Sequence, residues 1–167
     1  KFRPLDKQHA RREIGIAAGR KVIISVGGLV ERKGFHRVIE VLPELRRSFP
    51  DILYIIVGGA SVEGNNEQVL RDMVSGLWLY DHVLFAGPQP HDQLNRWLSA
   101  ADVFCLATSN EGWANVFLEA MACGLPVVTT RVGGNTEVVC APEFGILTQL
   151  GDKEALKQAL KKTLSNE

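Results

Sequence analysis

The sequence has no excess of charge of either sign. Lys and Arg together number 19, as do Asp and Glu, so the formal net charge at pH 7 is zero. A neutral domain creates no overall field that draws in nucleic acid or an anionic membrane, so only a local basic patch would attract either. The balance of charge therefore argues against nucleic acid as a partner.

Long apolar runs are also missing. No stretch approaches the roughly 18 residues that a membrane-spanning helix needs, and no signal-peptide pattern is present. The cysteines are odd in number and lack metal-ligand spacing; they are Cys105, Cys123 and Cys140. Because each lies among apolar residues, we expect three small buried side chains, which is typical of a reducing cytoplasm.

Common catalytic and metal-binding patterns are absent as well. The histidines show no HExxH or other ligand spacing, and we expect each to be structural or solvent-exposed; they are His9, His36, His82 and His91. There is no GxSxG nucleophile motif. The first glycine-rich loop matches neither GxGxxG nor the P-loop, which disfavours a dinucleotide-dependent oxidoreductase. The sequence predicts no metal site.

The sequence does contain a regular alternation of short apolar strands and amphipathic helices. We expect strands at residues 21–26, 52–57, 83–86, 103–106, 126–129 and 145–147. We expect helices around residues 38–49, 67–77, 92–100, 114–122, 136–139 and 153–164, the last capped by Asp152. Strands that are apolar on both faces indicate a parallel sheet covered on both sides.

This pattern predicts an α/β domain, a Rossmann-like doubly wound parallel sheet of about six strands. Residues 1–20 are mixed and polar, and we interpret them as a linker that enters from a domain missing from this chain. Residues 21–167 then form the domain itself. Ligands of such sheets bind beyond the carboxyl ends of the strands, so the loops that follow the strands are the candidate site.

The loop after the first strand combines the glycine pair Gly27-Gly28 with Lys33. Paired glycines let a backbone approach a ligand closely, and free amides at the start of a helix attract phosphate. A tight turn with a solvated Arg32-Lys33 pair explains the same residues without a ligand.

The loop after the fourth strand carries Glu111, and Glu119 follows eight residues later, a little over two helical turns. Glu119 lies in an otherwise apolar stretch, where a carboxylate costs free energy unless it is hydrogen-bonded. Sugar and ribose hydroxyls are suitable donors. An exposed helix charge for Glu119 and a helix-capping role for Glu111 remain alternatives.

Together these loops resemble the C-terminal domain of the retaining GT-B glycosyltransferases, the group 1 family. The resemblance runs from about Phe2 to Leu164. Its most specific part is Glu111 to Glu119 followed by Ala-Met-Ala-Cys-Gly-Leu-Pro-Val-Val, which resembles the E-x7-E motif of the family. Residues 26–35 and 133–137 match two further blocks in order and spacing.

The resemblance implies a domain that binds a nucleoside-diphosphate sugar and transfers a hexose with retention. The acceptor, a carbohydrate or a lipid-linked molecule, would be held by the missing N-terminal domain, so this chain alone is expected to be inactive. No cofactor and no metal would be needed. The full-length protein would be cytoplasmic, with a peripheral membrane position open to it. The resemblance is compatible with UDP, GDP or ADP as the nucleotide part.

The same resemblance implies roles for individual residues. Lys33 would hold the diphosphate and act with Glu111 in catalysis, Glu111 would contact the donor sugar, and Glu119 would accept hydrogen bonds from ribose. Further donor contacts would come from Gly27, Gly28, Gly87, Gly112, Trp113, Ala114, Asn115 and Val116. Gly87 begins the segment Gly87-Pro88-Gln89, which would border the base.

One position departs from the family pattern. The family usually has a basic residue, most often arginine, where this chain has Gly28. Either Arg32 or a residue of the missing domain would supply the second cation, or the affinity for the donor would be lower. Two other functions therefore stay open, a GT-B sugar-nucleotide epimerase and a non-catalytic nucleotide-sugar-binding module.

Overall fold

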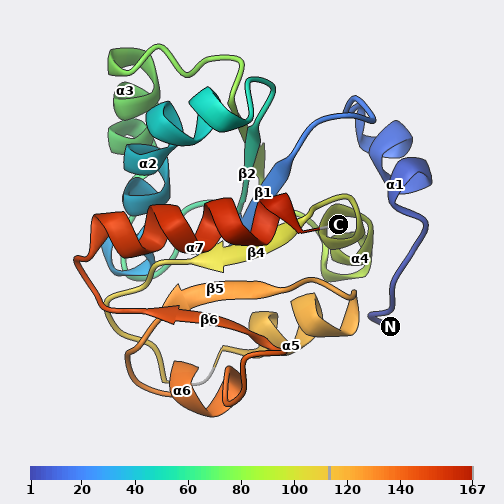
Figure 1. The fold of residues 1–167 in the computed structure, drawn as a ribbon. Helices are drawn as coiled ribbons and strands as arrows, with labels where there is room; N and C mark the ends of the chain where they lie inside the picture. Colours follow the sequence, from blue (N-terminus) through green and yellow to red (C-terminus); the bar gives the residue numbers. More distant parts are fainter. Residues whose placement is uncertain (113, 167) are drawn as a thin grey trace.

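The computed structural model describes residues 1–112 and 114–166. Six parallel strands form one sheet in the order β3-β2-β1-β4-β5-β6 (Figure 1). They are β1 (Val22–Val26), β2 (Leu53–Val57), β3 (Val83–Gly87), β4 (Val103–Leu106), β5 (Val127–Thr130) and β6 (Gly145–Thr148). This order confirms the predicted doubly wound parallel sheet.

The helices also follow the predicted alternation. They are α1 (Lys7–Ile14), η1 (Glu31–Lys33), α2 (Phe35–Ser48), α3 (Glu67–Gly76), η2 (His91–Gln93), α4 (Leu94–Ser99), α5 (Asn115–Ala122), α6 (Asn135–Val138) and α7 (Lys153–Ser165). Asp152 caps α7 as expected, because its carboxylate accepts a hydrogen bond from the amide of Ala155. The helix expected at residues 92–100 is divided into the 3-10 turn η2 and the short α4.

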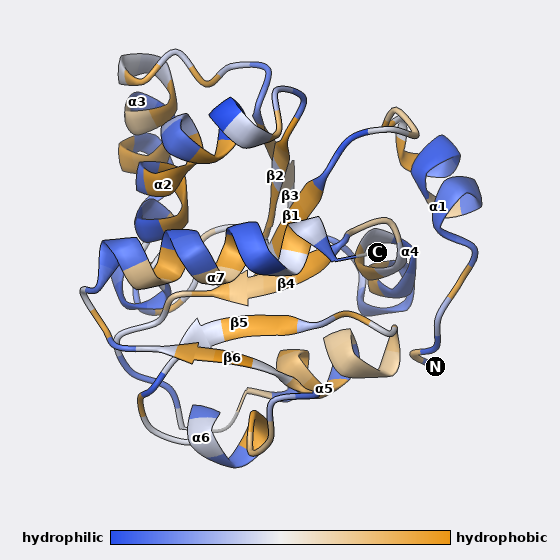
Figure 2. Cartoon of the chain, in the orientation of Figure 1, coloured by the Kyte–Doolittle hydropathy of each residue, from blue (hydrophilic) through white to orange (hydrophobic). Residues whose placement is uncertain are grey.

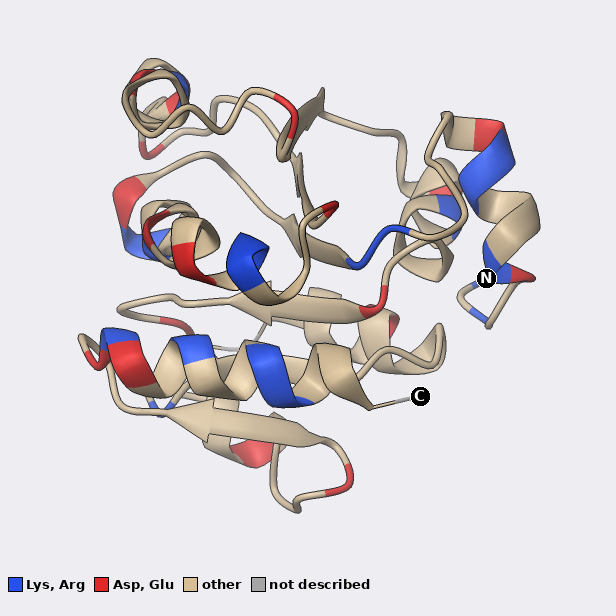
Figure 3. Cartoon of the chain, turned by 45° about the horizontal axis from the view of Figure 1, so that its top comes forward, with Lys and Arg blue, Asp and Glu red and all other residues tan. Residues whose placement is uncertain are grey.

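A separate hydrophobic core lies on each face of the sheet. Helices α2, α3 and α7 cover one face, and α4, α5 and α6 cover the other. Because successive strand residues point to opposite faces, Ile23 contributes to the first core and Ile24 to the second. Apolar residues fill the strands (Figure 2), and no charged residue lies within them (Figure 3).

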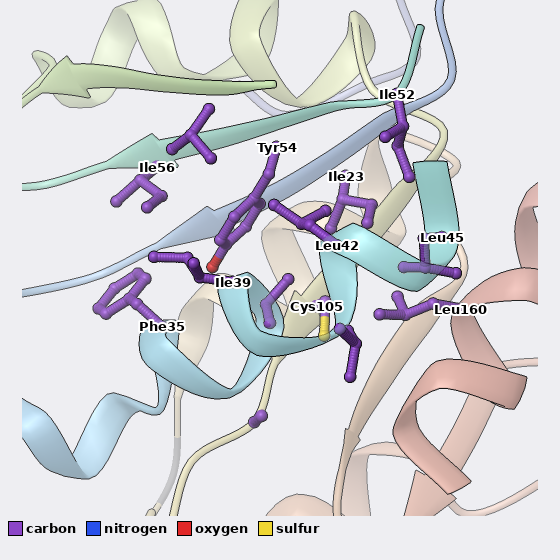
Figure 4. Close-up of a cluster of buried hydrophobic side chains, with 14 of the residues drawn as sticks. Ile23, Phe35, Ile39, Leu42, Leu45, Ile52, Tyr54, Ile56, Cys105 and Leu160 are labelled. Atoms are coloured by element: carbon purple, nitrogen blue, oxygen red, sulfur yellow. The ribbon is translucent and has the colours of Figure 1, made fainter. Parts of the chain in front are cut away.

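Helix α2 supplies much of the first core. Phe35, Ile39, Leu42 and Leu45 recur at helical spacing and are at most 2% exposed. They pack over β1 and β2; in Figure 4, Ile39 and Leu42 lie next to the ring of Tyr54, whereas Leu45 lies beside Leu160. Burying each such side chain stabilises the fold by about 1.5–3 kcal/mol.

A short polar chain crosses the middle of this core. The hydroxyl of Tyr54 on β2 donates to Oγ of Ser25 on β1 at 2.7 Å, and that Oγ in turn donates to the carbonyl oxygen of Cys105 on β4. Burial raises the pKa of the Tyr54 hydroxyl and of the Cys105 thiol. The Tyr54 hydroxyl therefore stays protonated, as its role as a donor requires.

The polar segment at residues 1–20, which we interpreted as a linker, contains helix α1 and is packed on the domain. Arg11 of α1 is 2% exposed. Its guanidinium donates to the carbonyl oxygens of Ala100, Ala18 and Arg20 at 2.7–2.9 Å, and to Asp102 at 2.9 Å. One arginine thus attaches α1 to the loops beside it. The amino-acid composition of the segment does not reveal these contacts. The origin of this segment in another domain stays a prediction.

The cysteines differ from one another. Cys105 and Cys123 are buried as expected, whereas Cys140 is exposed, so the expectation for it was wrong. Cys140 follows α6 in a loop, and its apolar neighbour Val139 is the residue that faces the core. Among the helices of the described residues, none has both the length and the apolar composition to cross a membrane.

Replacing Arg11 should test how firmly α1 is held. Arg11→Ala leaves buried carbonyl oxygens without donors and Asp102 without one of its cations, so we expect a loss of about 3 kcal/mol in the free energy of unfolding. Chemical denaturation measures this loss. The exposed neighbour provides the control, since Arg12→Ala should change stability by less than about 0.5 kcal/mol. Equal effects of the two changes would show that the Arg11 contacts contribute little.

Candidate functional site

The candidate site lies where the loops after β1 and β4 meet. These strands are neighbours, with Ile23 opposite Val103, so their carboxyl ends open at the same edge of the sheet. Nζ of Lys33, at the end of η1, lies 2.8 Å from Oε2 of Glu111 in the loop after β4. The structure thus brings together the two candidate catalytic residues.

Both members of this pair are shielded from solvent. The side chain of Lys33 is 14% exposed and that of Glu111 is 8% exposed. The stem of Lys33 passes over Gly27, where an added Cβ would lie 3.6 Å from Cδ of the lysine. Nη1 of Arg32 lies 3.7 Å from the same Oε2 atom, so the Glu111 carboxylate faces two cations.

The glycine pair after β5 holds the backbone of Glu111. The amide of Gly134 donates to the carbonyl oxygen of Glu111 at 3.0 Å. Gly133 has φ +48°, and a Cβ at this position would lie 1.8 Å from that oxygen. The Gly134 amide is thus engaged within the protein. This loop therefore positions Glu111.

Helix α5 offers an anion-binding end close to Glu111. It begins at Asn115 with Ala114 as its N-cap, and no described side chain caps it. Its first turn has no acidic residue, and the amide of Phe117 donates to the carbonyl oxygen of Ala114 at 3.2 Å, so the amides of Asn115 and Val116 and the helix dipole are the groups that can attract an anion. Gly112 and Asn115 are exposed, Val116 is half-buried, and Trp113 lies outside the described residues.

Further along α5, Glu119 has a partner that the sequence analysis missed. Its side chain is 19% exposed, and its Oε1 atom lies 2.9 Å from Nε2 of His91 in η2. The carboxylate is thus hydrogen-bonded, as an anion in an apolar stretch requires. His91 is solvent-exposed, as expected, but it is also part of the site. The signal for this role in the sequence was the position of His91 in the loop that follows β3.

A groove of about 290 Å³ lies beside this pair, at the carboxyl ends of β1 and β2. It is lined by Val26, Gly27, Gly28, Val57, Gly58, Gly59, Ala60, Pro88, Gln89, His91 and Leu94. Gly87 ends β3 next to the lining residues Pro88 and Gln89. Most of these residues are small or apolar, so the groove leaves room for a flat ring to lie against the backbone.

The structure gives a steric reason for Gly28. A Cβ at this position would lie 2.9 Å from Cβ of Ser61 in the loop after β2, so a larger residue requires that loop to move. The same loop carries Glu63, which accepts two hydrogen bonds of 2.6 Å from Arg32. These hydrogen bonds lower the pKa of Glu63 and raise that of Arg32. The sequence analysis named Arg32 but not its partner.

The residues that the structure describes contain no group of three or more His, Cys, Asp or Glu side chains that could hold a metal ion. The cations that converge on Glu111 come from side chains of the protein. These are Lys33 and Arg32.

A parallel sheet that ends in a cationic pair, an uncapped helix and a glycine-lined groove has the form of the C-terminal half of a GT-B fold. The sequence profile described as "Glycosyl transferases group 1" matches residues 6–167. The chain therefore belongs to the group 1 glycosyltransferases. This membership and the observed fold confirm the resemblance found in the sequence.

Three similar proteins illustrate the relationship. The D-inositol 3-phosphate glycosyltransferase of Corynebacterium urealyticum is 36% identical over 163 residues, which cover 96% of this chain and 38% of that protein. Sucrose-phosphate synthase from Thermosynechococcus elongatus has a TM-score of 0.88 and 29% identity, over 99% of this chain and 41% of that one. HepE of Anabaena, solved with UDP-glucose, has a TM-score of 0.83 and 26% identity, over 96% and 43% of the two chains. The chain thus spans about two fifths of these relatives.

The contact between Gly133 and Glu111 can be tested by stability. Gly133→Ala forces a Cβ into the carbonyl oxygen of Glu111 and strains a left-handed backbone, so we expect a loss of about 3 kcal/mol. Gly151→Ala is the matched control. Its φ is +85° but nothing lies within 4 Å of the added Cβ, so only backbone strain of about 1–2 kcal/mol applies. Chemical denaturation compares the two, and equal losses would contradict the close approach.

Proposed function

We propose that this chain is the donor-binding domain of a retaining glycosyltransferase and that its donor is a nucleoside-diphosphate sugar. The observation that carries the proposal is the position of Lys33. Its ammonium group is bonded to Glu111, which lies just before the uncapped start of α5. A lysine and free helix amides at one edge of a parallel sheet form a site for a doubly charged phosphate group.

The proposed diphosphate would exchange partners with Glu111. In the structure, Lys33 is already paired with that carboxylate at 2.8 Å. An incoming diphosphate would be a second anionic partner for Lys33 and the first anionic partner for the amides of α5. Lys33 would then release the carboxylate of Glu111. Glu111 can then accept a hydrogen bond from a hydroxyl of the donor sugar.

The chemistry assigned to these groups is stabilisation of the leaving group. Cleavage of a glycosidic bond has a transition state with oxocarbenium character, and negative charge grows on the departing diphosphate. Lys33 and the N-terminus of α5 would stabilise that charge. The leaving phosphate would take the proton of the acceptor on the same face of the sugar, which retains the configuration without a covalent intermediate.

The nucleoside would occupy the groove beside His91. The glycine ends of β1 and β2 leave room for the base, and Glu119 lies within reach of the same region through its contact with His91. A carboxylate with a free oxygen is a strong acceptor for ribose hydroxyls. The UDP-glucose complex of the Anabaena relative supports a donor of this class.

The acceptor would be held by the part of the protein that corresponds to the rest of the relatives' length. A carbohydrate or a lipid-linked molecule fits this role. We therefore propose that this chain binds the donor but requires that other part for transfer, in a cytoplasmic protein that approaches the membrane if its acceptor is a lipid.

The diphosphate role of Lys33 is tested by calorimetry with UDP, GDP and ADP and with the matching nucleosides. Lys33→Ala should weaken the preferred diphosphate by about tenfold to a hundredfold, because a charge-assisted phosphate contact contributes about 1.5–3 kcal/mol. The nucleoside should bind as before. Lys7→Ala is the control, since Lys7 forms an ion pair of similar length with Asp102 on another part of the domain. Equal losses for nucleotide and nucleoside would refute the assignment.

The two glutamates should separate binding from transfer. Glu119→Gln should raise the dissociation constant of the nucleoside diphosphate by about tenfold to a hundredfold, because it removes a charged acceptor for ribose. Glu111→Gln should leave that constant within about threefold or lower it, since Lys33 loses a competing anion, and should lower the transfer rate of the full-length protein by about tenfold or more.

Thermal denaturation of both glutamate variants controls for damage to the fold. If Glu111→Gln weakens the free nucleotide as much as Glu119→Gln does, the division of roles is wrong. If neither change alters binding while the melting temperature falls, the two carboxylates serve the fold. The binding-module alternative is then favoured over catalysis.

A further inference from the structure

The pair formed by His91 and Glu119 is asymmetric. Glu119 is the one charged residue in α5, and its side chain is 19% exposed, whereas the side chain of His91 is 74% exposed. His91 binds only one carboxylate oxygen, Oε1, at 2.9 Å. Within residues 1–112 and 114–166, Oε2 of Glu119 has no hydrogen-bond donor. The pair therefore leaves one acceptor oxygen open beside the groove.

The ring of His91 is held in place although it is exposed. It begins η2 directly after Pro90, whose ring fixes φ. The ring of Phe2 packs edge-on against the imidazole with a centroid distance of 5.1 Å. The N-terminal segment that carries Phe2 is itself anchored on α4, since the amide of Arg3 donates to Oδ1 of Asn95 at 3.0 Å. An exposed imidazole between two such contacts has few orientations open to it.

The direction of the hydrogen bond follows from its partners. A charged carboxylate only accepts, so Nε2 of His91 must carry the proton, in either the neutral or the charged ring. The final torsion of a glutamate is broad, and its two oxygens exchange places easily when nothing holds them. A fixed donor on Oε1 removes that freedom and fixes the direction in which Oε2 points.

We propose that His91 is a positioning residue that makes the site selective for ribonucleotides. By holding Oε1, it aims Oε2 of Glu119 at a ribose hydroxyl, so the hydroxyl meets a carboxylate that is already oriented. Without His91, the carboxylate turns freely or toward water, and a ribose hydroxyl gains less from it. This proposal rests on the proposed function, which assigns Glu119 to the ribose.

The test compares nucleotides that differ only in the ribose hydroxyls. The probe is whichever of UDP, GDP and ADP binds best, together with its 2′-deoxy and 3′-deoxy forms, and calorimetry gives the dissociation constants. The unmodified chain should prefer the ribose form by about tenfold or more over at least one deoxy form. His91→Phe keeps an aromatic ring next to Phe2 but loses the donor, so it should reduce this ratio to within about threefold.

Three further variants complete the design. His91→Gln keeps an N–H donor and should restore most of the preference for ribose. His9→Phe is the matched control, because it removes a similar histidine–glutamate pair, with Glu13 at 3.4 Å on α1, and should leave the ratio unchanged. Glu119→Gln should abolish the ratio. All variants should keep the melting temperature within about 2 °C, since the replaced side chains are on the surface or half-buried.

The outcomes distinguish a failure of the positioning role of His91 from a failure of the ribose role of Glu119. If Glu119→Gln abolishes the preference and His91→Phe retains it, His91 does not position the carboxylate, and the further proposal is wrong while the ribose assignment stands. If His91→Phe weakens the ribose and deoxy forms equally, His91 contacts the base or the phosphates directly, which also overturns the proposal. If Glu119→Gln retains the preference, or the unmodified chain has none, the ribose assignment itself fails.

Discussion

The pairing of β1 with β4 is the constraint on which the candidate site depends. The strands before this point run outward to β3 and the later strands run outward to β6, so the chain reverses its direction across the sheet here. Loops that leave neighbouring strands toward opposite sides open a crevice between them. Lys33 and Glu111 lie 78 positions apart in the sequence, yet their side chains meet because the strands before them are adjacent. The groove, the start of α5 and the glycine turns are arranged around the same reversal.

Four ion-paired side chains at this edge, Lys33 among them, balance one another before any ligand arrives. Lys33 and Arg32 supply two positive charges, and Glu111 and Glu63 supply two negative ones, each within hydrogen-bond distance of a cation. A phosphate group therefore finds no unpaired side-chain cation among these four residues, and it must take a cation from a carboxylate. The backbone at the start of α5 adds a positive potential that an anion reaches without separating an ion pair. The affinity of such a site for phosphate depends on the free energy needed to separate the carboxylates from their cations.

The strands and most helices could be predicted because their causes are local. A run such as Leu53–Val57 is apolar at every position, which is the mark of a strand covered on both faces. The E-x7-E spacing likewise identified Glu111 and Glu119. The partners of these residues could not be predicted, because Glu63 and His91 reach them through tertiary contacts between different loops. The burial of Arg11 could not be predicted for the same reason, since its acceptors are carbonyl oxygens that no sequence pattern indicates.

The close contact between Gly28 and Ser61 limits which side chains position 28 can carry. A side chain at position 28 overlaps Ser61 unless the loop after β2 shifts, and that loop also carries the Glu63 partner of Arg32. Residues in contact have non-additive effects when they are exchanged. Changes at position 28 and in the Ser61–Glu63 segment therefore have coupled effects on the structure. Arginine at position 28 fits this domain only together with a rearranged loop after β2, and that rearrangement also displaces the anionic partner of Arg32.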